Sequence, residues 1–156
     1  MPIHAGDKAP GFSLPDQEGK LHELKSYLGS WVLLYFYPKD DTPGCTLEAC
    51  SIRDNWDEFS QAGIQVFGIS ADSVKSHQKF STKYKLPFTL LADEGKKIVK
   101  DSGVYGKKKF MGKEYMGTNR TSFLIDPKGK VAKIYEKVKP TEHAEQVLHD
   151  VKDLSA

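Results

Sequence analysis

One stretch of sequence decides the fold, namely WVLLYFYP at residues 31–38 followed by KDDTPGC at residues 39–45. The first part is a continuous run of aliphatic and aromatic residues, which predicts a strand that is buried on both faces and central in a parallel sheet. Pro38 ends this strand. Thr42-Pro43 then combines an N-cap residue with a proline at the first helical position, so we expect one helix from there to about Gly63.

The sequence on either side predicts further strands and helices in a regular order. Apolar runs rich in β-branched and aromatic residues predict strands, and amphipathic segments after a capping residue predict helices. The expected strands are residues 12–14, 21–24, 64–70, 88–91, 121–125 and 131–135, and the expected helices are 73–84, 94–102 and 141–154. Residues 103–119 are rich in Gly and Lys and are expected to be mostly loop or a short hairpin.

This order of elements predicts an α/β fold in a single domain that spans residues 1–156. Residues 126–129 read Asp-Pro-Lys-Gly between two apolar runs, which is a strong hairpin signal. The central sheet should therefore be mixed, with a parallel portion and an antiparallel hairpin, and flanked by helices. The order resembles the thioredoxin fold with an N-terminal β-hairpin extension and an inserted helix.

Composition and charge exclude several classes of protein. Lys and Arg total 23 against 21 Asp and Glu, so the net charge of +2 lacks the basic surplus expected of a nucleic-acid-binding protein. The longest apolar stretch, residues 31–37, is too short to span a bilayer. Residues 1–7 lack the basic start and apolar run of a secretory signal. We expect a cytoplasmic protein, and a mature organellar form without its transit peptide would look the same.

The chain has only two cysteines, Cys45 and Cys50. In a reducing compartment a close pair is more typical of catalysis or metal binding than of a structural disulfide. A structural zinc site needs four ligands, and no histidine lies near this pair in the sequence; His77 is far away. We therefore expect neither a metal nor a cofactor.

Cys45 lies in the first turn of the predicted helix. Unpaired backbone N–H groups and the positive end of the helix dipole favour thiolate over thiol there, and the thiolate is the nucleophile. The alternative is a small buried apolar residue, as many free cysteines are. The polar residues 39–44 that precede Cys45 favour the reactive interpretation.

Cys50 lies in the body of the same predicted helix. Five residues along an ideal helix separate two Cα atoms by about 8.7 Å and turn the side chains some 140° apart. A disulfide needs Cα atoms within roughly 7 Å, so the pair cannot bond while the helix is intact. Cys50 is therefore either half of a redox pair whose helix unwinds in each cycle or a residue that packs in the core.

Residues 37–50, YPKDDTPGCTLEAC, resemble the active-site motif of the peroxiredoxins, most closely the bacterioferritin comigratory protein subfamily, called peroxiredoxin Q in plants. The resemblance extends over the whole length, through residues 6–12, 68–70 and 120–126. It implies a thiol-dependent peroxidase that reduces hydrogen peroxide and small organic hydroperoxides. It also implies an intramolecular Cys45–Cys50 disulfide, recycled by thioredoxin or a similar dithiol, in a monomer.

The resemblance also implies a role for each site residue. Cys45 is the thiol that attacks the peroxide and becomes a sulfenic acid, and Cys50 is the resolving thiol. The Thr42 hydroxyl binds the thiolate and the peroxide, Arg120 holds the thiolate and polarises the O–O bond, and Pro38 shields the sulfur from water. Without the resemblance, Thr42 is an ordinary N-cap, Arg120 a surface residue and Pro38 a strand terminator.

Two charged residues of the predicted helix are further candidates. Glu48, one turn after Cys45, is a possible supporting residue that orients Arg120, and a solvated carboxylate is an equally good interpretation. Arg53 could add positive potential to the site, and otherwise it is a surface charge of the helix.

Other functions stay open at this level. Thioredoxin-like disulfide exchange is the nearest rival, although it usually employs Cys-x-x-Cys. A non-catalytic binding module with the same fold is a second alternative. A nucleic-acid module has only Lys107–Lys109 in its favour, and so short a basic run is more often a solvated loop.

Overall fold

The computed structural model describes residues 3–155, with the side chain of residue 110 outside that description. The helices are α1 (Pro43–Asp54), α2 (Trp56–Gln61), α3 (Val74–Tyr84), α4 (Lys97–Asp101) and α5 (His143–Ser155), with a 3-10 helix at Leu24–Tyr27. The strands are β1 (Ser13–Pro15), β2 (Leu21–Glu23), β3 (Trp31–Phe36), β4 (Ile64–Ser70), β5 (Thr89–Ala92), β6 (Tyr105–Phe110), β7 (Lys113–Thr118), β8 (Ser122–Ile125) and β9 (Val131–Tyr135).

Strand β3 is the centre of a mixed five-stranded sheet with the order β5-β4-β3-β8-β9. It pairs in parallel with β4, with Leu33 opposite Val66, and antiparallel with β8, with Leu34 opposite Phe123. The predicted α/β class, the mixed sheet and the central buried strand are confirmed. Only one neighbour of β3 is parallel, because the β8–β9 hairpin occupies its other side.

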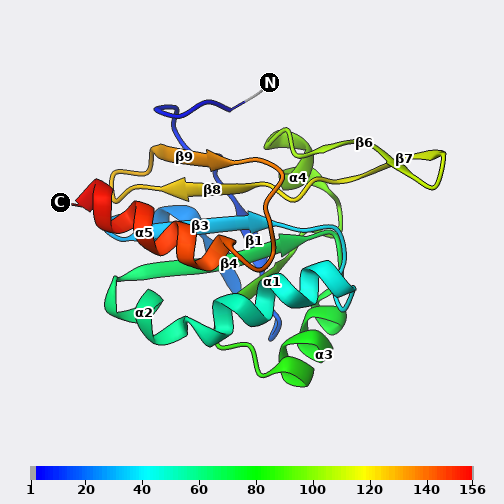
Figure 1. Ribbon diagram of the computed structural model, residues 1–156, viewed down its shortest axis with the longest axis horizontal. Helices are drawn as coiled ribbons and strands as arrows, with labels where there is room; N and C mark the ends of the chain where they lie inside the picture. The colour runs from blue at the N-terminus through cyan, green and yellow to red at the C-terminus, as the bar shows by residue number, and fades with distance from the viewer. Residues whose placement is uncertain (1–2, 156) are drawn as a thin grey trace.

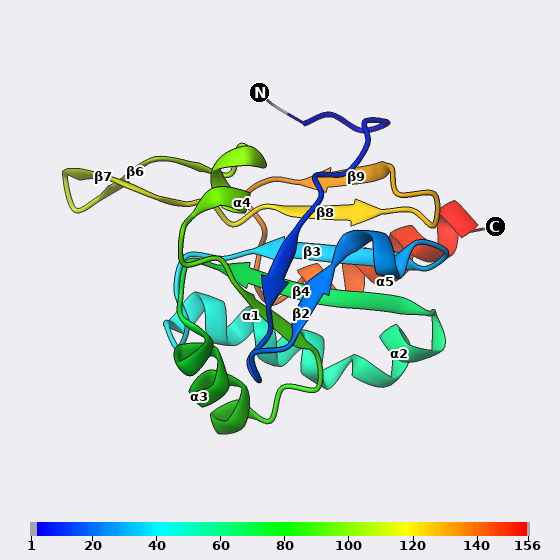
Figure 2. The same cartoon turned by 180° about the vertical axis from the view of Figure 1, so that it is seen from behind.

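The side chains of β3 alternate between two apolar cores. Leu33 and Tyr35 belong to the core that also contains buried residues of α1, α2, α3 and α5. Val32, Leu34 and Phe36 belong to the core on the opposite face, with residues of β1 and α4. Figure 1 shows α1 and α5 over one face of the sheet, and Figure 2 shows the β1–β2 hairpin over the other. Helix α1 thus starts beside the carboxyl end of the central strand β3.

The helix expected to run from Thr42 to about Gly63 is in fact two helices. Asn55 separates α1 from α2 with φ of −105° and ψ of 15°. Its side-chain amide donates to the carbonyl of Ser51 at 2.8 Å, and such local side-chain bonds compete with continuation of a helix. The break comes after both cysteines, so α1 is continuous from Cys45 to Cys50.

Residues 105–118 form a longer hairpin than the predicted loop or short hairpin. β6 and β7 pair antiparallel over six residues each and project from the body of the molecule (Figure 1). Met111 and Gly112 form the turn with φ values of 52° and 80°, the two positive values that a type I′ turn requires. A methionine is an unusual residue at such a position, so the hairpin signal in the sequence is weak.

The other predicted elements are found close to their expected positions. Ser73 caps α3 by accepting a hydrogen bond from the Ser76 N–H at 3.0 Å, and β8 and β9 form the expected antiparallel hairpin. Within residues 3–155, none of the helices combines the length and the apolar character needed to cross a membrane.

Candidate active site

Cys45 lies in the first turn of α1, as the sequence predicted. Thr42 precedes the helix in an extended conformation, and its carbonyl accepts the first bond of the helix from the Thr46 N–H at 2.8 Å. Cys45 is only 1% exposed and belongs to the same buried cluster as Tyr35 and Ala49. Its side chain is therefore shielded from bulk solvent, and the charged groups beside this turn decide what the thiol can do.

The structure brings Arg120 against the start of α1. Its Nη1 lies 3.3 Å from Oε1 of Glu48. A Cβ built on Gly44 would lie 2.8 Å from Nη2, so the absence of a side chain at Gly44 allows the guanidinium to approach the backbone next to Cys45. Arg120 directly precedes Thr121 and β8, and its carbonyl accepts from the Val138 N–H at 3.1 Å, which fixes its position. A permanent positive charge thus lies beside the first turn of α1.

Glu48 is a buried carboxylate, so the solvated interpretation of this residue is wrong. It is 1% exposed, and its Oε2 atom has no hydrogen-bond partner among the described residues. Burial raises the pKa of Glu48 from its ordinary 4.5 to about 7, and the nearby Arg120 charge only partly opposes this. Glu48 therefore changes protonation near neutral pH, which changes the negative charge available to Arg120.

Replacing Glu48 with Gln should change how stability depends on pH. Because the folded state holds the proton more tightly, Glu48 contributes stability that is present below pH 4.5 and is lost as the pH rises through about 7. Between about pH 5 and pH 8, the free energy of unfolding of the unmodified protein should fall by a few kcal/mol relative to Glu48→Gln. Urea unfolding at both pH values measures this difference.

The exposed carboxylate Glu58 on α2 supplies the matched control for this prediction. Glu58→Gln should retain the fall in the free energy of unfolding that Glu48 causes between about pH 5 and pH 8. If Glu48→Gln also followed the unmodified protein across the same range, Glu48 would not take up a proton on folding.

Tyr35 is a residue of this site that sequence reasoning missed. It lies on β3, is 1% exposed, and its hydroxyl has no partner among the described residues. Burial and then the nearby Glu48 and Cys45 raise its pKa well above the ordinary value, so it stays a neutral phenol. A Cβ built on Gly68 would lie 2.7 Å from the Tyr35 hydroxyl, so Gly68 makes room for it. The only signal in the sequence was a tyrosine within an otherwise apolar strand.

The loop that leads into α1 contains Pro38 and Thr42. Pro38 is half-buried directly after β3 and Tyr37. The Thr42 hydroxyl donates to the carbonyl of Lys39 at 2.9 Å and makes no capping bond to the helix. Thr42 is therefore the N-cap by position but not through its side chain. In this arrangement its proton is directed into the loop, and only its oxygen lone pairs are free to accept.

Cys50 and Arg53 lie further along α1. Cys50 is half-buried, and both cysteines are free thiols on one continuous helix, as the spacing argument requires. Arg53 donates to the carbonyl of Tyr84 at 2.7 Å and pairs with Asp54 at 3.1 Å. Its guanidinium is thus held between α1 and the end of α3, and none of its hydrogen bonds involves Arg120 or Glu48.

Residues 5–134 match the AhpC/TSA family. The chain belongs to this family. It is 48% identical over 152 residues to peroxiredoxin Bcp of Escherichia coli K12, covering 97% of each chain. It is 44% identical to peroxiredoxin Bcp of Bacillus subtilis over 155 residues, covering 99% of each.

Solved structures share the fold of this chain. A mutant of Xylella fastidiosa PrxQ superposes with a TM-score of 0.93 at 32% identity, covering 99% of this chain and 98% of that one. Xanthomonas campestris bacterioferritin comigratory protein superposes with a TM-score of 0.87 at 36% identity. That protein was solved as trapped-intermediate and ligand complexes that bear on its alkyl peroxide reduction activity. The superposition covers 93% of this chain and 92% of the Xanthomonas chain. The predicted thioredoxin-like fold and the resemblance to the bacterioferritin comigratory protein subfamily are confirmed, and with them thiol-dependent peroxide reduction as the activity of the chain.

Proposed function

We propose that Cys45 is the thiol that attacks the peroxide and that Arg120 and Glu48 set the charge around it. The observation that carries this proposal is the approach of the Arg120 guanidinium to Gly44 and Glu48, on either side of Cys45 in the sequence. A buried thiolate in the first turn of α1 is stabilised by the unpaired N–H groups of the helix and by a permanent cation. The substrate class is a hydroperoxide, and the second substrate is a thiol reductant.

The first chemical step oxidises Cys45 and cleaves the peroxide. The Cys45 thiolate attacks the terminal peroxide oxygen, so that an S–O bond forms while the O–O bond breaks. The departing alkoxide or hydroxide takes a proton and leaves as an alcohol or water. Arg120 stabilises the negative charge that moves from the sulfur to the leaving oxygen, because its donors are already in place. Cys45 becomes a sulfenic acid.

The second step joins Cys45 to Cys50. The Cys50 thiol attacks the sulfenic sulfur, an S–S bond forms and water leaves. Because ideal helix geometry holds the two Cα atoms about 8.7 Å apart, the first turns of α1 must unwind before this bond can form. We infer that thioredoxin or a similar dithiol then reduces the disulfide. We also infer that the chain works as a monomer in the cytoplasm and that Thr42 and Pro38 contact the peroxide or cover the sulfur.

Replacing Arg120 with Lys should slow the first step about 10²-fold. The guanidinium contacts Glu48 with one nitrogen and fills the space beside Gly44 with another, and a single ammonium group cannot do both. Stopped-flow measurement of Cys45 oxidation by hydrogen peroxide gives the second-order rate constant. Arg53→Lys is the matched control, because it also replaces an arginine with a lysine, but at a position on α1 that takes no part in the Arg120–Glu48 contact. Equal rates for the two variants would contradict the role of Arg120.

A coupled assay tests the function against its nearest rival. Purified protein with thioredoxin, thioredoxin reductase and NADPH should consume hydrogen peroxide and small alkyl hydroperoxides. A disulfide exchanger would instead reduce the disulfides of insulin when supplied with a dithiol. Insulin reduction without peroxide consumption would contradict the proposed function.

A further inference from the structure

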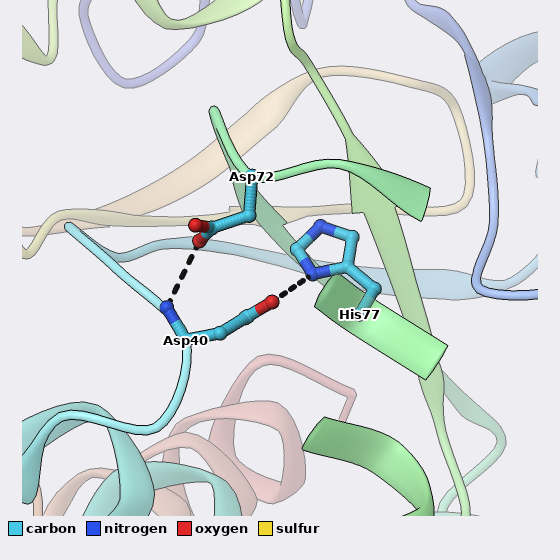
Figure 3. Close-up of side chains that lie close together, drawn as sticks. All are labelled: Asp40, Asp72 and His77. Atoms are coloured by element: carbon cyan, nitrogen blue, oxygen red, sulfur yellow. Dashed lines mark hydrogen bonds and ion pairs between the residues drawn. The ribbon is translucent and has the colours of Figure 1, made fainter. Parts of the chain in front are cut away.

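Behind the loop that leads into α1 lies a hydrogen-bonded cluster of the buried Asp40 and His77 and the half-buried Asp72 (Figure 3). Asp40 belongs to the loop of residues 37–42, between β3 and α1. Asp72 follows β4, and His77 lies in the first turns of α3. The side chains of His77 and Asp40 are 0% and 4% exposed. The cluster thus joins the loop in front of Cys45 to two elements that are distant in the sequence.

Asp40 is bonded through both oxygens and through its backbone. Its Oδ1 accepts from the Tyr37 hydroxyl at 2.6 Å. Its Oδ2 accepts from the Ser76 hydroxyl at 2.8 Å and lies 2.7 Å from His77 Nδ1. Its backbone N–H donates to Oδ2 of Asp72 at 2.9 Å. No other residue of the loop is held by as many bonds, so Asp40 fixes the position of the loop.

The partners of His77 define the hydrogen-bond pattern of this cluster. His77 Nε2 lies 2.9 Å from the carbonyl of Leu91 on β5, which can only accept, so Nε2 carries a hydrogen. Nδ1 faces a carboxylate whose two other partners are hydroxyl donors. Burial, the neighbouring Tyr35 and Asp40 raise the pKa of Tyr37 well above its ordinary value, so Tyr37 remains a donor. One hydrogen between His77 Nδ1 and Asp40 Oδ2 completes the pattern.

The same three residues also have the spacing of a small cation site. One ligand atom from each of Asp40, Asp72 and His77 lies within 4.8 Å of the others. Those side chains are, however, already paired, because Asp72 Oδ2 also accepts from the Ser70 hydroxyl at 2.7 Å. A metal ion would have to displace the hydrogen between Nδ1 of His77 and Asp40 as well as these bonds. These hydrogen bonds therefore favour a cluster that holds the loop in place over a metal site.

A second, exposed attachment ties the same loop to the other end of α3. The Asp41 carboxylate accepts from Lys83 Nζ at 2.8 Å and from the Tyr84 hydroxyl at 2.6 Å. Asp41 has a φ of 56°, a left-handed conformation that residues other than glycine seldom adopt. Such a conformation persists where its surroundings hold it in place. Thr42 and α1 follow directly, so the direction in which α1 begins depends on this loop.

We propose that Asp40 and His77 are positioning residues for Cys45. They hold the loop of residues 37–42 against β4 and α3, so that the first turn of α1 returns to the same place beside Arg120 in every cycle. They also give the chain a fixed point while α1 unwinds to bring Cys50 to Cys45. This inference rests on the proposed roles of the two cysteines.

Two substitutions of His77 separate positioning from simple packing. The amide of His77→Gln can replace Nε2 and donate to Leu91, but it leaves Asp40 without its nitrogen donor. The amide of His77→Asn can replace Nδ1 and donate to Asp40. We expect His77→Gln to lower the second-order rate constant for Cys45 oxidation by about tenfold and His77→Asn by at most about threefold. Closure of the Cys45–Cys50 disulfide should be as fast in His77→Gln as in the unmodified protein, or faster.

Lys79→Ala is the control, because it removes an exposed side chain from the same helix that makes no hydrogen bond to the loop among the described residues, and its oxidation rate should be unchanged. If His77→Gln does not fold, Tyr37→Phe removes only the hydroxyl donated to Asp40 and should slow oxidation about threefold. A folded His77→Gln, or failing that a folded Tyr37→Phe, with the unmodified oxidation rate would overturn the inference, as would equal slowing of both steps. If Cys45 of the unmodified protein failed to react with peroxide, the proposed function would fall together with this inference.

Discussion

Replacing Cys45 with Ser should lower peroxide consumption by at least about 10³-fold, because a serine hydroxyl stays protonated where a thiol can ionise. The substitution replaces sulfur with oxygen in a residue that is 1% exposed, and the new side chain has nearly the same shape. The variant should therefore fold, and circular dichroism can verify this. The measurement is the coupled thioredoxin assay, with hydrogen peroxide and a small alkyl hydroperoxide as substrates.

The control for this loss is the first oxidation of Cys50→Ser, which retains Cys45 and should react with one equivalent of peroxide at the unmodified rate. A folded Cys45→Ser protein that still consumed peroxide with thioredoxin would show that another group takes the oxygen. The approach of Arg120 to the start of α1 would then need a different explanation.

Replacing Cys50 with Ser should abolish turnover with thioredoxin while leaving one oxidation of Cys45 intact. The sulfenic acid on Cys45 then has no internal thiol to attack it, and a protein dithiol reaches a buried sulfur poorly. We expect a burst of one peroxide per chain, followed by a steady-state rate at least about 10²-fold below that of the unmodified protein. Rapid quenching followed by assay of the remaining peroxide measures the burst, and the absorbance of NADPH measures the steady-state rate.

A small thiol provides the control for this second variant. Added in excess, it should restore turnover in Cys50→Ser, because it can enter the site and attack the sulfenic sulfur itself. It should do nothing for Cys45→Ser. Full steady-state turnover of Cys50→Ser with thioredoxin alone would remove Cys50 from the mechanism, and α1 would then have no need to unwind.

The sequence predicted those parts of the structure that depend on local pattern. The apolar run of residues 31–37 has only one favourable environment, the middle of a sheet, and it was assigned correctly. Thr42-Pro43 predicted the start of α1 correctly, because both residues favour that position without help from tertiary contacts. The placement of Cys45 in the first turn followed directly.

The features that were missed depend on contacts between distant segments. Burial of Glu48 results from packing of α1 onto the sheet and from Arg120, which is 72 residues away in the sequence. The bond between Asp40 and His77 joins residues 37 apart, and a histidine in a helix gives no sign of its partner. The break at Asn55 was missed for another reason. Asparagine is tolerated inside helices, and the sequence does not show whether its side chain will bond to the carbonyl of Ser51 and end the helix there.

Mass spectrometry of the reduced protein after one equivalent of hydrogen peroxide tests the central claim most directly. We predict that a single chain loses the mass of two hydrogen atoms, that this loss lies in the one tryptic peptide that contains both Cys45 and Cys50, and that no species of twice the mass appears. An unchanged Cys45, or a disulfide that joins two chains, would contradict the proposal that this thiol takes the oxygen and is resolved within its own helix.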